Sequence, residues 1–367
     1  MKWIKSVFVM GLIVCSMASF SCGSSSPALV DAMDPEKKIF FGDLIENIEI
    51  IPLEFHHSSG FGEVERIAVF ENQIFILDPT FTKSVQVYGL TGEYMRTIKS
   101  FENTAIWDFI IDEQKEEMVL FVLGNKFERF SMSGEYLGSQ NSDFPVLSML
   151  FVNDGGMMCD LGQQVMDDGQ NFNLAYMDRQ KYTVQSFQIP FREEPILVQD
   201  RIRNYAINGA DTYFAPPFDN NIYKLDGSGN VETVVNLDFK SKLFSIEAFN
   251  NSKISGEDKF ITGMDGMSYA KGKLFFHFLN GEDTNFRYFD FESDKLFALG
   301  FGKDIPSFLY QFILMNYNFE YQEGLITVLD LDYLRPLLAG GNQDLPFDLQ
   351  NILMGEALFA IVKIKFL

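Results

Sequence analysis

Cysteine, histidine and basic side chains are scarce in this 367-residue sequence, and each shortage excludes a kind of protein. With 3 cysteines, no framework of internal disulfides can hold the chain together. With 3 histidines, metal binding and acid–base catalysis have few side chains to draw on. Lysine and arginine number 29 against 51 acidic residues, a formal net charge of -22, and this sign excludes a general nucleic-acid binder.

Long hydrophobic runs are also missing, apart from a short one near the N-terminus. Lys2 and Lys5 precede an apolar stretch, Val7–Met17, which is shorter than the roughly 20 residues that cross a bilayer. Small residues and then Cys22 follow, an order typical of an export signal that ends in a bacterial lipobox. We therefore expect residues 1–21 to be a lipoprotein signal peptide, Cys22 to carry the lipid and residues 22–35 to form a flexible tether. Ordinary secretion and an uncleaved anchor are the alternatives.

Aromatic residues are abundant, and the rest of the chain has the pattern of short strands. They make up 15% of the sequence, with 39 Phe, 14 Tyr and 2 Trp, a bias typical of β structure. From about residue 48 onward, apolar runs alternate with turn residues. Six short apolar runs each follow a turn, and we interpret them as equivalent strands: Asn72–Asp78, Glu117–Val122, Gly156–Leu161, Asp211–Ala215, Lys273–Phe278 and Gly324–Leu329. Five hairpin-like segments lie between them: Val87–Tyr94, Arg129–Tyr136, Ala175–Tyr182, Tyr223–Asn230 and Tyr288–Lys295.

A unit that repeats every roughly 40 to 50 residues is the signature of a β-propeller blade. We predict an all-β, six-bladed β-propeller over residues 36–367, with four antiparallel strands in each blade. The last strand, Ala357–Lys365, has no partner after it in the sequence, whereas the run Ile48–Glu54 lies ahead of the first blade. The N-terminal strand therefore pairs with the C-terminal strand and closes the ring, which removes the exposed sheet edges.

These segments resemble a known family. The tether that follows Cys22, the run Ile48–Glu54, then Arg66–Val69, Ile74–Asp78 and Asp108–Asp112 are similar to the six-bladed β-propeller lipoproteins of Bacteroidota. The resemblance implies a propeller and a place in the cell envelope, and it implies no settled activity. The tether lacks the acidic cluster that looks like a surface-export tag in these bacteria, which favours an outer-membrane lipoprotein facing the periplasm over one on the cell surface.

Known catalytic and metal-binding motifs are missing. No Ser-His-Asp order and no Gly-x-Ser-x-Gly elbow is present. Cys159 has apolar neighbours and is interpreted as a packed thiol, and His277 as a half-buried strand histidine. The segment Asp226–Asn230 spaces oxygen atoms as a calcium loop does, but the later ligand positions hold apolar residues, so we interpret it as a hairpin turn. No cofactor is predicted, and a calcium ion in the channel has no motif to support it.

The candidate binding residues lie where the chain enters the innermost strand of a blade. Trp107, beside Asp108, either stacks on a sugar or packs as a core residue between blades. Arg201 and Arg203 either clamp a carboxylate or pair with local acids. Tyr310 enters the sixth blade in the same way. Two longer insertions, residues 190–204 and 238–259, are expected on the ligand-binding face.

We therefore expect a membrane-tethered, non-catalytic recognition or scaffold module, monomeric, whose partner is a glycan, a peptide or another envelope protein. The alternative is an enzyme of the propeller lactonase or lyase type with a metal ion in the central channel. Asp, Glu and Asn side chains gathered from several blades would have to hold that ion.

Overall fold

The protein is described from a computed structural model. The structure describes residues 27, 29–56, 62–123, 125–152, 155–162, 171–190, 204–209, 211–240, 242–243, 261–281, 283–302, 309–310, 313–314, 319–322, 324–338 and 347–367.

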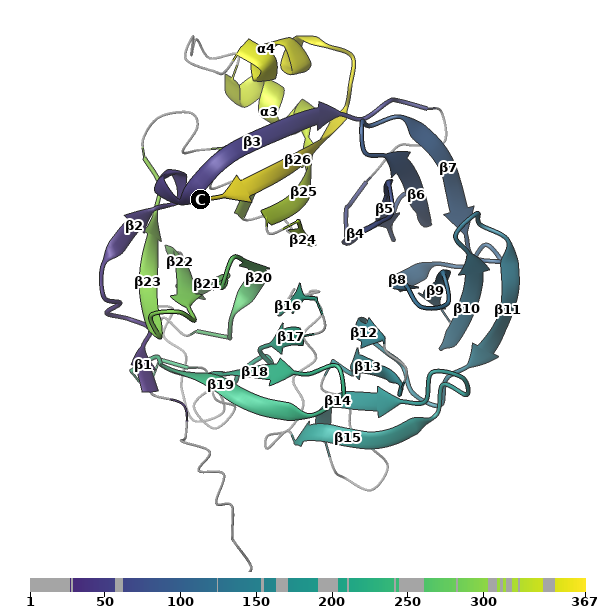
Figure 1. The fold of residues 1–367 in the computed structure, drawn as a ribbon, viewed down its shortest axis with the longest axis horizontal. Helices are drawn as coiled ribbons and strands as arrows, with labels where there is room; N and C mark the ends of the chain where they lie inside the picture. Colours follow the sequence, from purple (N-terminus) through teal and green to yellow (C-terminus); the bar gives the residue numbers. More distant parts are fainter. Residues whose placement is uncertain are drawn as a thin grey trace, which may run out of the picture.

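The described residues form six β-sheets arranged as blades around a central axis, so the predicted six-bladed propeller is confirmed. Figure 1 shows the blades following one another around the ring in chain order. Neighbouring strands of each blade core are antiparallel, as the alternating runs and turns predicted. The second strands of blades 1 and 2, β5 and β9, are buried along almost their whole length, because each lies inside its sheet and is covered by the blades on both sides.

The first three blades hold the strands from β4 to β15. Blade 1 consists of β4 (Arg66–Phe70), β5 (Gln73–Asp78), β6 (Ser84–Gly89) and β7 (Tyr94–Lys99). Blade 2 consists of β8 (Ile106–Asp112), β9 (Glu117–Val122), β10 (Lys126–Ser131) and β11 (Tyr136–Asn141). Blade 3 consists of β12 (Ser148–Val152), β13 (Met157–Asp160), β14 (Phe172–Met177) and β15 (Val184–Pro190).

The other three blades include strands from the N-terminal segment. Blade 4 consists of β16 (Tyr205–Asn208), β17 (Asp211–Phe214), β18 (Asn221–Leu225), β19 (Val231–Asp238) and β1 (Leu29–Asp31). Blade 5 consists of β20 (Asp265–Ala270), β21 (Lys273–Asn280), β22 (Asp283–Asp290), β23 (Lys295–Gly300) and β2 (Lys38–Phe40). Blade 6 consists of β24 (Phe319–Tyr321), β25 (Gly324–Asp330), β26 (Phe359–Phe366) and β3 (Ile45–Pro52). A 3-10 helix, η1 (Phe41–Leu44), joins β2 to β3.

The ring closes in blade 6, as predicted, by pairing of the two ends of the chain. Strand β3 lies antiparallel to β26 with Ile51 opposite Ile361 and Ile48 opposite Ile364. In Figure 1 the purple β3 and the yellow β26 lie side by side at the top of the ring. Because β26 also pairs with β25 along its whole length, the C-terminal strand joins the first part of the chain to the last blade.

Six separate apolar clusters fill the interfaces between adjacent blades. Each cluster draws its side chains from two neighbouring sheets, for example Phe75 of blade 1 and Phe109 of blade 2. Where the ring closes, the cluster between blades 6 and 1 combines Ile51 and Ile361 of blade 6 with Ile74 of blade 1. Stability therefore comes from contacts between blades rather than from one central core, and each blade needs both of its neighbours.

The predicted hairpins join the third and fourth strands of the first five blades. Gly92 and Gly134 occupy equivalent turn positions with φ of 90° and 92°, a conformation that glycine adopts without strain. The Asp226 carboxylate accepts backbone hydrogen bonds from Ser228 and Asn230 at 2.8 and 2.9 Å. Its oxygens are engaged by its own turn, which confirms the hairpin interpretation of this segment.

The folded domain begins earlier than the predicted residue 36. Strand β1 pairs in parallel with β19, and β2 pairs in parallel with β23, so the N-terminal segment covers the outer edges of blades 4 and 5. Ala32 is fully buried, and its carbonyl accepts a hydrogen bond from Nε of Arg287 at 3.2 Å. The second half of the segment expected to be a free tether is thus part of the sheet surface, where it protects edges that could pair with other chains.

Two short helices interrupt blade 6 between its second and third strands. They are α3 (Leu331–Leu338) and α4 (Phe347–Met354), which the all-β prediction did not include. Arg335 of α3 connects the two helices, because it donates hydrogen bonds to the carbonyls of Leu353 and Gly355 at the end of α4, both at 2.9 Å. Within the described part of the chain, no helix combines the length and apolar character needed to cross a membrane.

Deleting residues 359–367 should abolish cooperative folding. The deletion removes β26, leaves β3 without a partner and opens the seam between blades 6 and 1. We expect the shortened protein to lose its sharp thermal transition in calorimetry, whereas removing Leu367 alone, which is 68% exposed, should have little effect. A soluble shortened protein that melts cooperatively would contradict the closure.

Candidate functional site

The candidate site lies on the face of the ring at which the innermost strands begin, called the start face below. The innermost strand of blade 2, β8, carries an irregularity between Ile106 and Asp108, where the pairing with β9 skips a residue. At this bulge the side chains of Trp107 and Asp108 point in different directions. Trp107 is 39% exposed, whereas Asp108 is 3% exposed. Trp107 is therefore not the core residue that one interpretation of the sequence allowed.

Trp107 borders a pocket of about 230 Å³ between blades 1 and 2. The pocket is lined by six residues: Glu63, Pro79, Thr80, Ala105, Ile106 and Trp107. Most of this lining is apolar, and one carboxylate and one hydroxyl are the polar side-chain groups available to a ligand. A flat apolar surface beside a few polar groups is typical of small-ligand sites.

The wall formed by Pro79 and Thr80 is held in place by Asp78, which is fully buried at the end of β5. The Asp78 carboxylate accepts backbone hydrogen bonds from Thr80 and Phe81, at 3.1 and 2.9 Å. It also accepts one from Gly62 at 3.1 Å, next to Glu63, so the same carboxylate fixes both segments of the pocket wall. The pocket is thus preorganised, which lowers the entropy lost when a ligand binds.

Asp108 has a structural partner instead of a ligand. Nη1 of Arg66, at the start of β4, lies 2.7 Å from Oδ2 of Asp108 and 2.7 Å from the carbonyl oxygen of Met149 in β12. The same Asp108 oxygen accepts the Met149 backbone N–H at 2.5 Å. The guanidinium also lies over the ring of Tyr205, 5.6 Å from its centroid. This cluster joins the innermost strands of blades 1, 2, 3 and 4.

The Arg66–Asp108 pair is almost completely shielded from water, with 4% exposure of each side chain. Burial lowers the pKa of the Arg66 guanidinium, but Asp108, together with Tyr205 and Glu65, raises this pKa overall. The guanidinium therefore stays charged, and the two groups depend on each other because an isolated buried charge is strongly destabilising.

A second buried acid lies nearby at the end of β13. Asp160 is 2% exposed, and its Oδ1 accepts the Gly162 backbone N–H at 2.8 Å. Burial raises the pKa of this carboxyl to about 7, although the hydrogen bonds from Gly162 and from the Asn204 side chain oppose the rise. Cys159, next to it, is fully buried, and burial raises the pKa of its thiol well above the usual value. The packed-thiol interpretation of Cys159 is confirmed.

His277 lies in β21 of blade 5. Its Nε2 lies 3.9 Å from Oδ2 of Asp265 at the start of β20, and its side chain is 12% exposed. Burial lowers the pKa of the imidazole, while Asp265 acts in the opposite direction. Among the described residues, no group of three His, Cys, Asp or Glu side chains is placed to hold a metal ion.

The structure brings together few of the residues that the sequence suggested. Trp107 lines a pocket, but Asp108 faces away from it into the ion pair with Arg66. Tyr310 packs against Phe41, with ring centroids 5.8 Å apart, at the edge of the apolar cluster between blades 5 and 6.

The other predicted site residues, Cys22, Arg201 and Arg203, lie outside the described part of the chain. Most of the two insertions, residues 190–204 and 238–259, lie outside it as well.

Four residues of this face were not expected from the sequence: Glu63, Arg66, Asp160 and Asn204. Each is a single polar residue in a loop or at the end of a strand, and its neighbours in the sequence do not indicate which residue of another blade it contacts. The partners are distant in the sequence, as with Arg66 and Asp108, so no local pattern could identify them.

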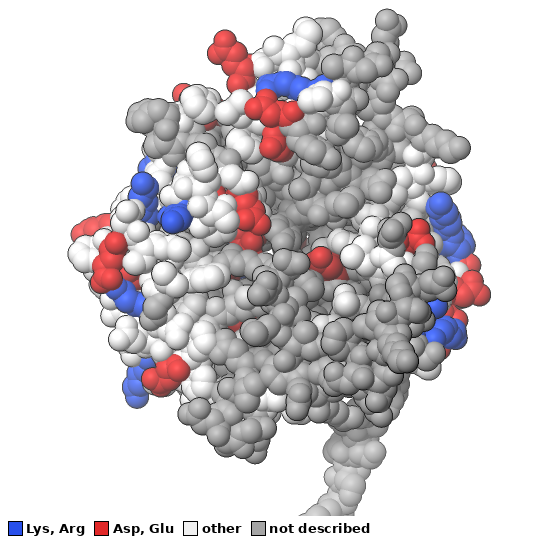
Figure 2. Space-filling model, turned by 180° about the vertical axis from the view of Figure 1, so that it is seen from behind, with Lys and Arg blue, Asp and Glu red and all other residues white. Residues whose placement is uncertain are grey.

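Charges are unevenly placed on the face seen in Figure 2. Acidic side chains lie near the middle of that face, whereas the lysines and arginines drawn there lie toward the rim. These acidic side chains have the same sign as the formal net charge of -22, so they disfavour anionic ligands at their own positions.

Comparisons with known proteins assign the fold but no activity. A family described as "Domain of unknown function (DUF4934)" matches residues 27–340. A "putative exported protein" from Bacteroides fragilis has a similar structure, with a TM-score of 0.70 and 14% identity, over 90% of this chain and 98% of that one. BamB from Moraxella catarrhalis is more distant, with a TM-score of 0.38 and 13% identity, over 70% of this chain and 67% of that one. No curated protein matches the chain.

Replacing Arg66 by alanine should lower the free energy of unfolding by about 3–5 kcal/mol, because Asp108 would remain buried without its cation. Urea unfolding measures this change. The double variant R66A/D108A is the control, and it should recover part of the loss since it leaves no unpaired charge. An R66A protein as stable as the original would contradict the buried pair.

The pKa of Asp160 predicts a stability that falls as the pH rises. The folded protein holds this proton up to about pH 7, whereas the unfolded chain releases it near the ordinary value of 3.8. Between these pH values folding takes up a proton, so stability decreases by about 4 kcal/mol from pH 3.8 to pH 7.

The variant D160N tests this prediction because it keeps the shape of the side chain and cannot ionise. It should be more stable than the original protein by about 2–4 kcal/mol at pH 8, and the difference should vanish near pH 4. Denaturant unfolding at both pH values measures it. A difference that does not change with pH would show that Asp160 titrates normally.

Proposed function

This chain belongs to the DUF4934 family, and we propose that it is a non-catalytic recognition module of the bacterial cell envelope that binds a neutral glycan at Trp107. The observation that carries the proposal is the 39% exposure of Trp107 over a preformed, mostly apolar pocket. An indole that is exposed beside an apolar pocket offers its flat face to a ligand.

The pocket chemistry fits one face of a sugar ring. Sugar rings present C–H groups on their faces and hydroxyls around their edges, so one face can stack on the Trp107 indole. The Glu63 carboxylate and the Thr80 hydroxyl then lie at the rim, where they can bond to edge hydroxyls. Phe81, adjacent to Thr80, is 72% exposed and extends the apolar surface along the start face. Because Glu63 is the charged residue of the lining, a neutral glycan fits better than an acidic one.

We propose that the protein reaches this ligand from the outer membrane, tethered through a lipid on Cys22 and facing the periplasm as a monomer. Support comes from the signal-like residues 1–21 and from the similar fold of a Bacteroides fragilis protein that is described as exported. Since strand β1 begins at Leu29, the free tether would be the short stretch between Cys22 and that strand.

Trp107 provides its own reporter for the test. The sequence has 2 tryptophans, and the other, Trp3, lies in the predicted signal peptide, so the fluorescence of the processed protein comes from Trp107 alone. Titration with a panel of neutral oligosaccharides should shift or quench this emission. We expect the variant W107A to bind the active oligosaccharide roughly thirtyfold more weakly in calorimetry, the loss of about 2 kcal/mol typical of a central aromatic contact.

The variant F40A is the matched control, because Phe40 is an aromatic residue that is 48% exposed on β2 of blade 5, away from the pocket. It should bind as the original protein does. If no oligosaccharide changes the emission, or if F40A loses as much affinity as W107A, the glycan proposal is wrong.

A further inference from the structure

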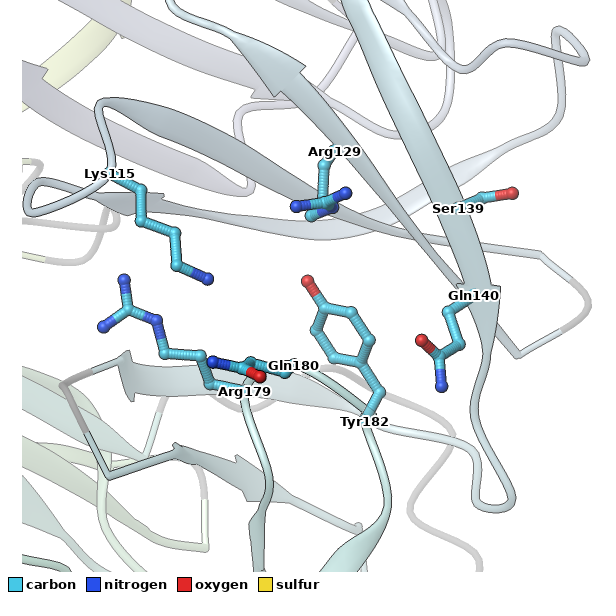
Figure 3. A pocket seen from close by; sticks show the side chains of 7 residues that line it. All are labelled: Lys115, Arg129, Ser139, Gln140, Arg179, Gln180 and Tyr182. Atoms are coloured by element: carbon cyan, nitrogen blue, oxygen red, sulfur yellow. The ribbon is translucent and has the colours of Figure 1, made fainter.

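A second pocket, unrelated to Trp107, lies on the opposite face of the ring between blades 2 and 3. Its volume is about 320 Å³, and it is lined by Lys115, Arg129, Ser139, Gln140, Arg179, Gln180 and Tyr182. Lys115 lies in the turn after β8, the strand that carries Trp107 near its beginning, so the two pockets are at opposite ends of that strand. Figure 3 shows the side chains of this pocket.

The lining is rich in hydrogen-bond donors and carries three cations, in a chain whose formal net charge is -22. In Figure 3 the Lys115 amine, the Arg129 guanidinium and the Tyr182 hydroxyl point toward a common space from three different elements. No hydrogen bond or ion pair engages the Lys115 amine within the described residues. Such convergence of cations from separate elements is unusual on an acidic surface.

Each of the two arginines contacts a carboxylate of blade 2. Nη1 of Arg129 lies 3.4 Å from Oε2 of Glu117, a long contact that uses one of its N–H groups. Arg179 is 8% exposed; it pairs with Asp112 through Nη2 and donates from Nη1 to Gln114 at 2.9 Å. Arg129 thus keeps N–H groups for a ligand beside the Lys115 amine.

Tyr182 makes the pocket rigid. It is 4% exposed, and its ring stacks on Phe127 with centroids 4.5 Å apart and the planes 15° from parallel. Burial raises the pKa of its hydroxyl to about 12, so at neutral pH the hydroxyl keeps its proton and can donate it to an anion. The pocket thus presents a fixed O–H donor beside the Lys115 amine.

We propose that this pocket binds a tetrahedral oxyanion, the sulfate or phosphate group of a ligand. Such a group has several acceptor oxygens pointing in different directions, which matches donors that converge from the turn after β8, from β10 and from the turn after β14. A planar carboxylate would use fewer of them. The site is independent of Trp107, since the two pockets share no lining residue.

Calorimetric titration of the processed protein with inorganic sulfate and with inorganic phosphate, at constant ionic strength, tests the proposal. We expect one-to-one binding with a Kd of about 1 mM for at least one of them, and weaker binding of acetate. Titration with glucose 6-sulfate and with glucose 6-phosphate then distinguishes a sulfated from a phosphorylated ligand. No binding of either inorganic ion at about 50 mM, or acetate binding as tightly, would overturn the proposal.

Charge-removing variants locate the site. K115Q and R129Q should each weaken binding of the inorganic anion by about tenfold or more, as expected when a charge-assisted hydrogen bond is lost. Lys99, exposed on β7 of blade 1, gives the matched control K99Q, which removes the same charge away from the pocket and should bind normally. W107A should also bind the anion normally.

Both lining residues are at least partly exposed, so K115Q and R129Q should fold, and an unchanged thermal transition verifies this. If the folded variants bind the anion as tightly as K99Q does, the anion lies elsewhere and the assignment of this pocket is wrong.

Discussion

The pairing of β3 with β26 is the interaction on which the rest of the structure depends. A propeller blade buries its faces only when it has neighbours on both sides, so an open ring would leave two blades with an exposed apolar face. Here Ile51 and Ile361 lie opposite each other in the closing pair and pack against blade 1 in the same cluster. One strand pairing thus completes both the hydrogen bonds of blade 6 and the sixth apolar interface.

Closure also fixes the geometry of the start face. Arg66 begins the first blade, and its guanidinium binds Asp108 in blade 2 and the Met149 carbonyl in blade 3. A buried ion pair of this kind adds little net stability, but it holds the innermost strands in register with one another. Because Asp108 is committed to that pair, the neighbouring Trp107 is left at the surface, over the pocket between blades 1 and 2.

The two pockets differ because their walls come from different parts of the blades. The Trp107 pocket is formed by loops that Asp78 anchors, and its lining is mostly apolar. The Lys115 pocket is formed by turns and an outer strand at the opposite end of β8, where polar side chains are solvated, and its lining is cationic. One rigid ring can therefore offer two ligands of different chemistry separate sites, without movement between blades.

The sequence by itself determined the blades, their number and the closing strand, because strand periodicity and turn chemistry, such as Gly92 and Gly134, are local properties. It also placed Trp107 at a loop that enters an innermost strand. Only the tertiary structure decided that a bulge exposes Trp107 and buries Asp108, that β1 and β2 cover two blades, and that Lys115 meets Arg129 and Arg179. The physical reason is that these contacts join residues of different blades or distant segments, and their positions depend on the twist and packing of whole sheets.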